Sequence, residues 1–274
     1  MEKAKELEKK YDWLQAAKIF EEVSEIALTE ENILEAARIQ EQMGYSYFRS
    51  ALQASTNKQF QHRMLQAVEA DRRASELFQK LDDEKYAAKV FASQAKAVYA
   101  SSWIETDPAK KRDLLNEWWD LNSNSLKLFE KIGDQLAIVT ICNDLMEGSM
   151  DCKYWIAPNW EESVKLRKEL ISFGERAISI LSKMNDVYQL ARAYCWSSCY
   201  YLIDNVAVIE YEKELIEKGS VYCKQALKYS QKIGDPWLLG WSNQAAYYCA
   251  LSTNDPDLEK ILKKTIECLS LIHI

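Results

Sequence analysis

The hydrophobic residues of this chain recur at intervals of three and four positions. The stretches 114–132 and 166–184 both show this spacing. It places apolar side chains along one face of an α-helix, and that face must pack against a neighbouring helix. No alternating pattern typical of a β-strand competes with it anywhere in the sequence. The pattern therefore predicts an all-α protein.

A ten-residue segment recurs along the chain at a nearly constant interval. Residues 125–134 read SLKLFEKIGD and residues 226–235 read ALKYSQKIGD, with looser copies at 74–83 and 177–186. The aspartates that end the four copies lie about 50 residues apart, and self-similarity at such a period is typical of a repeat architecture. Each repeat has room for two helices of about 20 residues and two short turns.

The spacing and the repeat together predict a helix near 10–27 followed by five pairs of helices. We name the first helix of each pair helix A and the second helix B, and helix B ends in the recurring segment. The predicted pairs are 30–55 with 58–81, 83–104 with 107–132, 134–155 with 159–184, 186–205 with 209–233, and 235–252 with 255–272.

Glycine, aspartate and proline mark the predicted helix ends. Gly133 and Gly234 adopt the left-handed conformation easily and so end a helix, while Asp134 and Asp235 are suited to cap the next one. All four prolines fall at predicted helix starts, where the backbone N–H has no partner to lose. They are Pro108, Pro158, Pro236 and Pro256.

Short motifs in the predicted helices resemble the tetratricopeptide repeat. Met43-Gly44-x2-Tyr47 looks like the L-G-x2-Y part of its first helix, with Gln40 in the position of the tryptophan. The A-x3-F part of its second helix is similar to Ala16 with Phe20, Ala74 with Phe78, Ser125 with Phe129, and Ala177 with Leu181. The period is about 50 residues, against 34 in the tetratricopeptide repeat. The phrase LFEKIGD at 128–134, followed by a predicted helix, is similar to longer-helix relatives in bacterial and archaeal regulators.

The resemblance implies an architecture and a kind of binding surface. We expect one domain over residues 1–274, a right-handed α-solenoid of antiparallel helix hairpins with about five repeats plus an N-terminal helix. In such relatives the A helices line a concave surface that binds peptides, proteins or small effectors. The matching motif residues are packing positions. The apolar ending 271–274 indicates either a longer native chain or an end that self-associates.

Charge and composition exclude several classes of protein. The net charge is −7 and the basic clusters are short, which argues against a nucleic-acid partner. Residues 1–10 lack the apolar core of a signal peptide, and no stretch is long and apolar enough to predict a membrane span. The seven cysteines are odd in number and form no CxxC motif, so we expect free thiols and a cytoplasmic location.

Catalytic and metal-binding patterns are scarce. The two histidines, His62 and His273, are far apart, and no glycine spacing matches a phosphate-binding loop. Cys195 and Cys199 lie one helical turn apart, where core packing is favoured over a shared soft metal. Residues 82–84 (DDE) are suited to capping a helix or, as the alternative, to binding a divalent ion. We therefore expect no enzyme, no cofactor and no metal site.

Aromatic residues gather in the second half of the A helices. Tyrosine and tryptophan are frequent at binding hot spots, but bulky side chains also fill the cores between long helices. Neighbours such as Tyr200 and Tyr201 point about 100° apart, so one of each pair is expected in the core and the other on the groove. The candidate partner-binding residues are Tyr47, Tyr99, Trp103, Tyr154, Trp155, Trp196, Tyr200, Trp241 and Tyr247.

A second aromatic group lies in the connection 151–160, which is either a contact site or a segment that folds back onto its hairpin. The leading hypothesis is a non-catalytic scaffold that binds a protein or peptide on its concave A-helix surface. The alternative is the sensory domain of a larger signalling or transcriptional regulator. Self-association through the C-terminal helix is also consistent with the sequence.

Overall fold

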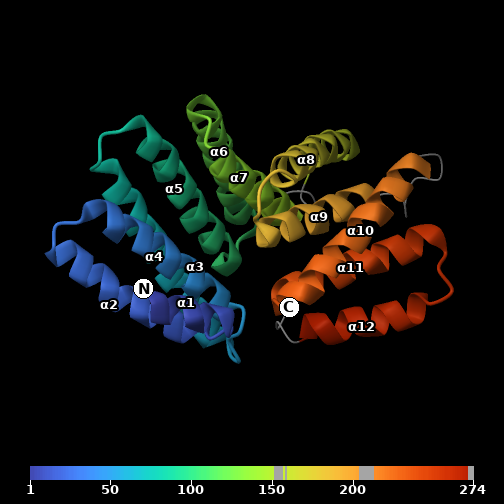
Figure 1. The fold of residues 1–274 in the computed structure, drawn as a ribbon, viewed down its shortest axis with the longest axis horizontal. Coiled ribbons are helices and arrows are strands. Elements are labelled where there is room, and N and C mark those ends of the chain that lie inside the picture. Colours follow the sequence, from blue (N-terminus) through green and yellow to red (C-terminus); the bar gives the residue numbers. More distant parts are fainter. Residues whose placement is uncertain (151–156, 158, 204–212, 271–274) are drawn as a thin grey trace. The chain divides into compact units, whose positions relative to one another are not determined.

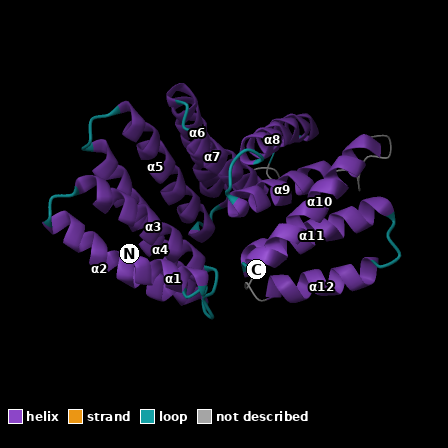
Figure 2. Ribbon diagram, viewed as in Figure 1, coloured by secondary structure: helices purple, strands orange, loops and turns teal. Residues whose placement is uncertain are grey.

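The computed structural model describes residues 1–270 except 151–156, 158 and 204–212, and every regular element among the described residues is a helix (Figures 1 and 2). The chain divides into two compact units, 1–134 and 135–274, which are described separately below. The all-α prediction is confirmed. The prediction of one domain over 1–274 stays a prediction.

Unit 1 contains six helices, each of which packs against the next along the chain. They are α1 (Glu2–Lys9), α2 (Trp13–Thr29), α3 (Ile33–Ala51), α4 (Asn57–Gln79), α5 (Glu84–Ile104) and α6 (Pro108–Ile132). The sequence pattern predicted all of these except α1, whose residues are mostly charged and which buries only Ala4.

Unit 2 contains the remaining described helices. They are α7 (Gln135–Gly148), α8 (Trp160–Leu181), α9 (Val187–Leu202), α10 (Lys213–Ile233), α11 (Pro236–Thr253) and α12 (Leu258–Ser270). Successive helices again pack together, so the two helices of each predicted A and B pair lie against each other. None of the described helices combines the length and the apolar character that a membrane crossing requires.

The helix ends follow the local chemistry of the sequence. Gly133 and Gly234 have φ values of 79° and 78°, in the left-handed region. Asp107 and Asp235 cap α6 and α11, and each is followed by a proline in the first turn. Asp83 caps α5 by accepting a hydrogen bond from the backbone N–H of Lys85, which confirms its capping role.

The motif residues of both helix types lie in the core. Both members of all four A-x3-F pairs are buried, as are Met43, Gly44 and Tyr47. Gln40, in the position of the motif tryptophan, is buried as well, and its side-chain amide donates to Ser24 Oγ at 2.7 Å. These residues hold helices together and are not available to a partner.

The two helix types of unit 2 differ in how closely they approach one another. Helix α9 contacts both α7 and α11, so the three A helices form a continuous layer. Among the described residues, the B helices α8, α10 and α12 make no comparably extensive contacts with each other. The A helices are therefore the more closely packed of the two helix types in this unit.

Candidate functional site

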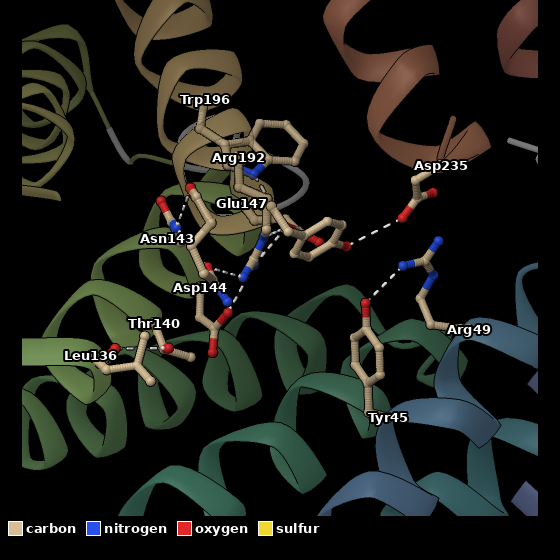
Figure 3. A network of polar contacts seen from close by, with 12 residues as sticks. Tyr45, Arg49, Leu136, Thr140, Asn143, Asp144, Glu147, Arg192, Trp196 and Asp235 are labelled. Atoms are coloured by element: carbon tan, nitrogen blue, oxygen red, sulfur yellow. Dashed lines mark hydrogen bonds and ion pairs between the residues drawn. The ribbon is translucent and has the colours of Figure 1, made fainter. Parts of the chain in front are cut away.

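A polar network crosses the A helices of unit 2 (Figure 3). We call it the A-helix network. It consists of Asn143, Asp144 and Glu147 on α7, Tyr188, Gln189, Arg192 and Trp196 on α9, and Asp235 at the start of α11. Residues three or four apart share a helix face, which is why these side chains meet between neighbouring helices.

Arg192 lies at the centre of the network. Its Nη2 lies 2.8 Å from both Asp144 Oδ1 and Glu147 Oε2, and its Nε donates to the same Glu147 oxygen at 3.2 Å. Its Nη1 donates to Gln189 Oε1 at 3.1 Å. Burial acts to lower the pKa of Arg192, but the carboxylates of Glu147 and Asp144 outweigh it and raise that pKa well above its usual range. The guanidinium therefore remains charged.

The network extends from Arg192 along α9 in both directions. The indole N–H of Trp196 donates to Glu147 Oε2 at 3.2 Å, and the hydroxyl of Tyr188 donates to Asp235 Oδ2 at 3.3 Å. The other oxygen of Asp235 accepts from the backbone N–H of Trp237 in the first turn of α11. Three A helices are thus fixed relative to each other by directional bonds.

The network reaches the surface at its acidic side chains. The side chains of Asp144 and Glu147 are 24% and 18% exposed to solvent, and the side chain of Arg192 is 12% exposed. Trp241 on α11 lies beside Trp196, with ring centroids 4.9 Å apart, and is partly exposed. This surface therefore combines carboxylates with an indole, and side chains of both kinds are partly open to solvent.

Two candidate tryptophans carry an unsatisfied donor. The indole Nε1 atoms of Trp103 on α5 and Trp241 on α11 are buried, with no hydrogen-bond partner in the described structure. Buried donors in folded proteins are nearly always paired, so each such group needs an explanation. One such group lies on an A helix of each unit.

Three of the aromatic candidates have a packing role. The solvent exposure of Tyr47, Trp196 and Tyr200 is 3%, 1% and 0%, so all three are buried. The hydroxyl of Tyr200 donates to the carbonyl of Met146 at 2.6 Å. The expectation that one of the neighbours Tyr200 and Tyr201 faces a groove is wrong, because both are buried where α9 packs against helices on several sides.

The other described candidates are partly exposed. Tyr99 and Trp103 lie edge to face on α5, with centroids 6.1 Å apart, and both contact Phe48 of α3. Tyr247 on α11 is partly exposed beside Tyr248. Tyr154 and Trp155 lie outside the described residues. In the connection 151–160, Trp160 begins α8 and is 53% exposed.

A second charged cluster links the A helices of unit 1. Glu41 on α3 accepts from Lys89 at 3.2 Å and from Lys96 at 3.3 Å, both on α5. Burial acts to raise the pKa of Glu41, but Lys96 and Lys89 outweigh it and lower that pKa. Asp71 on α4 lies near this cluster and against Gly44, where a Cβ would come within 2.5 Å of its carboxylate.

Asp71 is expected to make the stability of unit 1 depend on pH. Burial raises its pKa well above the usual range, and Lys96 opposes this only in part. The folded state therefore keeps this proton to a higher pH than the unfolded chain. The resulting stabilisation is complete below the unfolded pKa of about 4 and is lost as pH rises through the folded value.

Asp71→Asn removes that ionisation, so its stability relative to the parent chain should increase as pH rises from about 5 to 8. Urea unfolding across this range measures the difference, with the exposed Asp113→Asn on α6 as the control. A difference that stays constant with pH would contradict the assignment.

The structure also bears on the metal and cysteine alternatives. Within the described residues, no group of three or more His, Cys, Asp or Glu side chains is placed to hold a metal ion. Glu84, the last of the acidic residues at 82–84, pairs with Lys131. The six described cysteines are free thiols.

Comparisons with known proteins do not assign a family. No protein-family model matches the chain, and no curated protein matches it. It is similar to a solved structure described as a computationally designed self-assembling cyclic homooligomer, with 14% identity over 99% of this chain and 98% of that one. The TM-score of 0.22 is too low to establish a shared fold.

Proposed function

We propose that this chain is a non-catalytic interaction module that binds a protein segment or peptide on its A-helix surface. The observation that carries this proposal is the crowded layer of α7, α9 and α11, with carboxylates and an indole at its surface. The finer architecture belongs to the same proposal. It is a right-handed α-solenoid of about five tetratricopeptide-like repeats, located in the cytoplasm.

The partly exposed rings of Trp103 and Trp241 support a bound partner. Tryptophan rings that are open to solvent in the free chain add buried apolar area when a partner covers them.

The charged clusters support a preorganised surface. Arg192 bridges α7 and α9, and Glu41 joins α3 to α5, so neighbouring A helices are already held in place. A surface that does not reorganise pays less conformational entropy on binding, which raises the affinity that a given set of contacts provides. Arg192, Lys89 and Lys96 pair with carboxylates on neighbouring helices, so these side chains hold the helices together.

The double variant Trp241→Ala with Tyr247→Ala tests the proposal, since both residues are partly exposed aromatics of the A helix α11. We expect each hot-spot truncation to cost about 2 kcal/mol of binding free energy, so the double variant should lose its partner. Partners are captured from a lysate with the tagged chain, and the Kd of each purified partner is then measured by titration.

The matched control replaces aromatic residues of B helices, as Trp119→Ala with Trp160→Ala. Trp119 is partly exposed on α6, and Trp160 is exposed on α8. Circular dichroism confirms that both double variants keep their helices. Equal affinity of the A-helix variant and the parent chain, or equal losses in the two variants, would exclude the A-helix surface as the binding site.

A further inference from the structure

The charged residues of unit 2 are divided unevenly between its two helix types. Arg192 is the one lysine or arginine on α7, α9 and α11, whereas α8, α10 and α12 each carry several. The acidic residues within the A helices are Asp144 and Glu147, both on α7. Asp186 and Asp235 add one carboxylate each as the caps of α9 and α11. The A helices of unit 2 therefore carry more negative than positive charge.

Arg192 does not present its positive charge to a partner. Its Nε, Nη1 and Nη2 atoms all donate to Gln189 or to the two carboxylates of α7, and its side chain is only 12% exposed (Figure 3). Each carboxylate uses only one of its oxygens in these bonds. Oδ2 of Asp144 and Oε1 of Glu147 accept no hydrogen bond from any described residue. A partner therefore meets unused acceptor oxygens on this surface.

An indole surface lies beside these carboxylates. The N–H of Trp196 donates to Glu147 Oε2 at 3.2 Å, and the ring centroid of Trp196 lies 4.9 Å from that of Trp241. Trp196 is buried, whereas Trp241 is partly exposed. The face of an indole ring attracts a cation through its quadrupole. The carboxylates and the exposed indole thus favour the same kind of group, which is a cationic side chain.

We infer that the partner segment is basic, an inference that rests on the binding function proposed above. Arginine fits this surface better than lysine does, because its planar guanidinium donates two parallel bonds to a carboxylate and also stacks on an indole. An acidic segment would meet Asp144 and Glu147 with like charge, and the A helices of unit 2 offer it no unpaired lysine or arginine. The segment therefore combines arginine with apolar residues, which cover the ring of Trp241.

Charge complementarity of this kind acts mainly on the rate of association and on selectivity. The side chains of Asp144 and Glu147 both keep contact with water, so salt weakens their attraction for a partner. A partner held by apolar burial alone would bind with little dependence on ionic strength. Salt dependence therefore separates a basic partner from a purely apolar one.

Three synthetic peptide libraries test the inference with the full chain. All three have leucine, alanine and tyrosine at randomised positions, and they differ in whether the remaining positions hold arginine, glutamine or glutamate. The tagged chain is applied to each library, and the Kd values of the best binders are measured by titration. We expect the arginine peptides to bind about tenfold more tightly than the glutamine peptides at about 50 mM salt. This preference should largely disappear at about 500 mM salt.

Two variants locate the binding site. Asp144→Asn removes one carboxylate of the surface but keeps an oxygen for Arg192, so the arginine peptides should bind about threefold more weakly while the glutamine peptides bind as before. Trp241→Ala should weaken every peptide that binds the A-helix surface. Asp257→Asn is the matched control, because it removes the same charge at an exposed position just before the B helix α12. It should leave both affinities unchanged, and circular dichroism confirms that each variant stays helical.

The outcomes distinguish this inference from the proposed function. If glutamine or glutamate peptides bind best and Trp241→Ala weakens them, the basic partner is excluded and the binding function stands. Equal effects of Asp144→Asn and Asp257→Asn would show that arginine peptides bind through the net charge of −7 and not at this surface. A chain that binds no library would also overturn the inference, while capture from the lysate decides the proposed function separately. If a variant fails to fold, the library preference and salt dependence of the parent chain decide.

Discussion

Replacing Arg192 by alanine is expected to lower the free energy of unfolding of unit 2 by about 3–5 kcal/mol. The guanidinium bridges Asp144 and Glu147 and retains only 12% of its exposure. Its loss leaves two carboxylates on one face of α7 without their counter-charge. Because both keep some contact with water, the lower end of the range is expected. Urea unfolding followed by circular dichroism measures the change.

Lysine is not expected to replace Arg192. A single ammonium group cannot reproduce the bonds from Nε, Nη1 and Nη2, so Arg192→Lys should recover only part of the loss. The control Lys263→Ala breaks an exposed i,i+4 pair with Glu259 and should cost less than about 1 kcal/mol. An Arg192→Ala chain that unfolds at the parent's urea midpoint would show that the bridge does not stabilise the fold.

The helices were predictable because their signals are local. The spacing of apolar residues, the left-handed glycines and the Asp-Pro starts of α6 and α11 each act within a few residues, and the structure agrees with them. Helix α1 was not predicted, because its charged residues carry little periodic signal and only Ala4 is buried. The repeat register followed from the aspartates, since each caps a helix or directly precedes one.

The side chains of the candidate site were less predictable because they depend on contacts between helices. The aromatic pattern of the A helices predicts Tyr200 and Trp196 on a groove, yet α9 is covered on several sides and buries both. Charged residues on amphipathic helices usually face solvent, so nothing within one helix marked Arg192 or Glu41 as part of a bridge. The aromatic content of the A helices was evident, but not its division between core and surface.

A signal for the charged bridges does exist, at the spacing of the repeat. Arg192 follows Asp144 by 48 residues, and Lys89 follows Glu41 by the same number. In a stack of hairpins, residues about one repeat apart lie at equivalent positions on neighbouring A helices. Opposite charges at that separation therefore predict a bridge, and Arg73 with Glu25, also 48 residues apart, form another on the B helices of unit 1.

Gly174→Ala is expected to destabilise unit 2 by about 1–3 kcal/mol, even though alanine is the better helix former by about 1 kcal/mol. Gly174 lies on α8 where it packs against α9. A Cβ there would lie 2.0 Å from Ser197 Oγ, 3.1 Å from Ser197 Cβ and 3.2 Å from Met146 Sδ. The contact with Ser197 Oγ is so short that this hydroxyl must move. The contacts with Ser197 Cβ and Met146 Sδ would push α8 away from its neighbours.

The double variant Gly174→Ala with Ser197→Ala separates these two effects. It removes the hydroxyl but keeps the Cβ contact at 3.1 Å, so it should recover part of the loss and not all of it. Ser179→Ala, at an exposed position of the same helix, reports the gain from helix propensity alone. If Gly174→Ala raised the urea midpoint as Ser179→Ala does, the close approach of α8 to α9 would be refuted, because propensity would then outweigh packing.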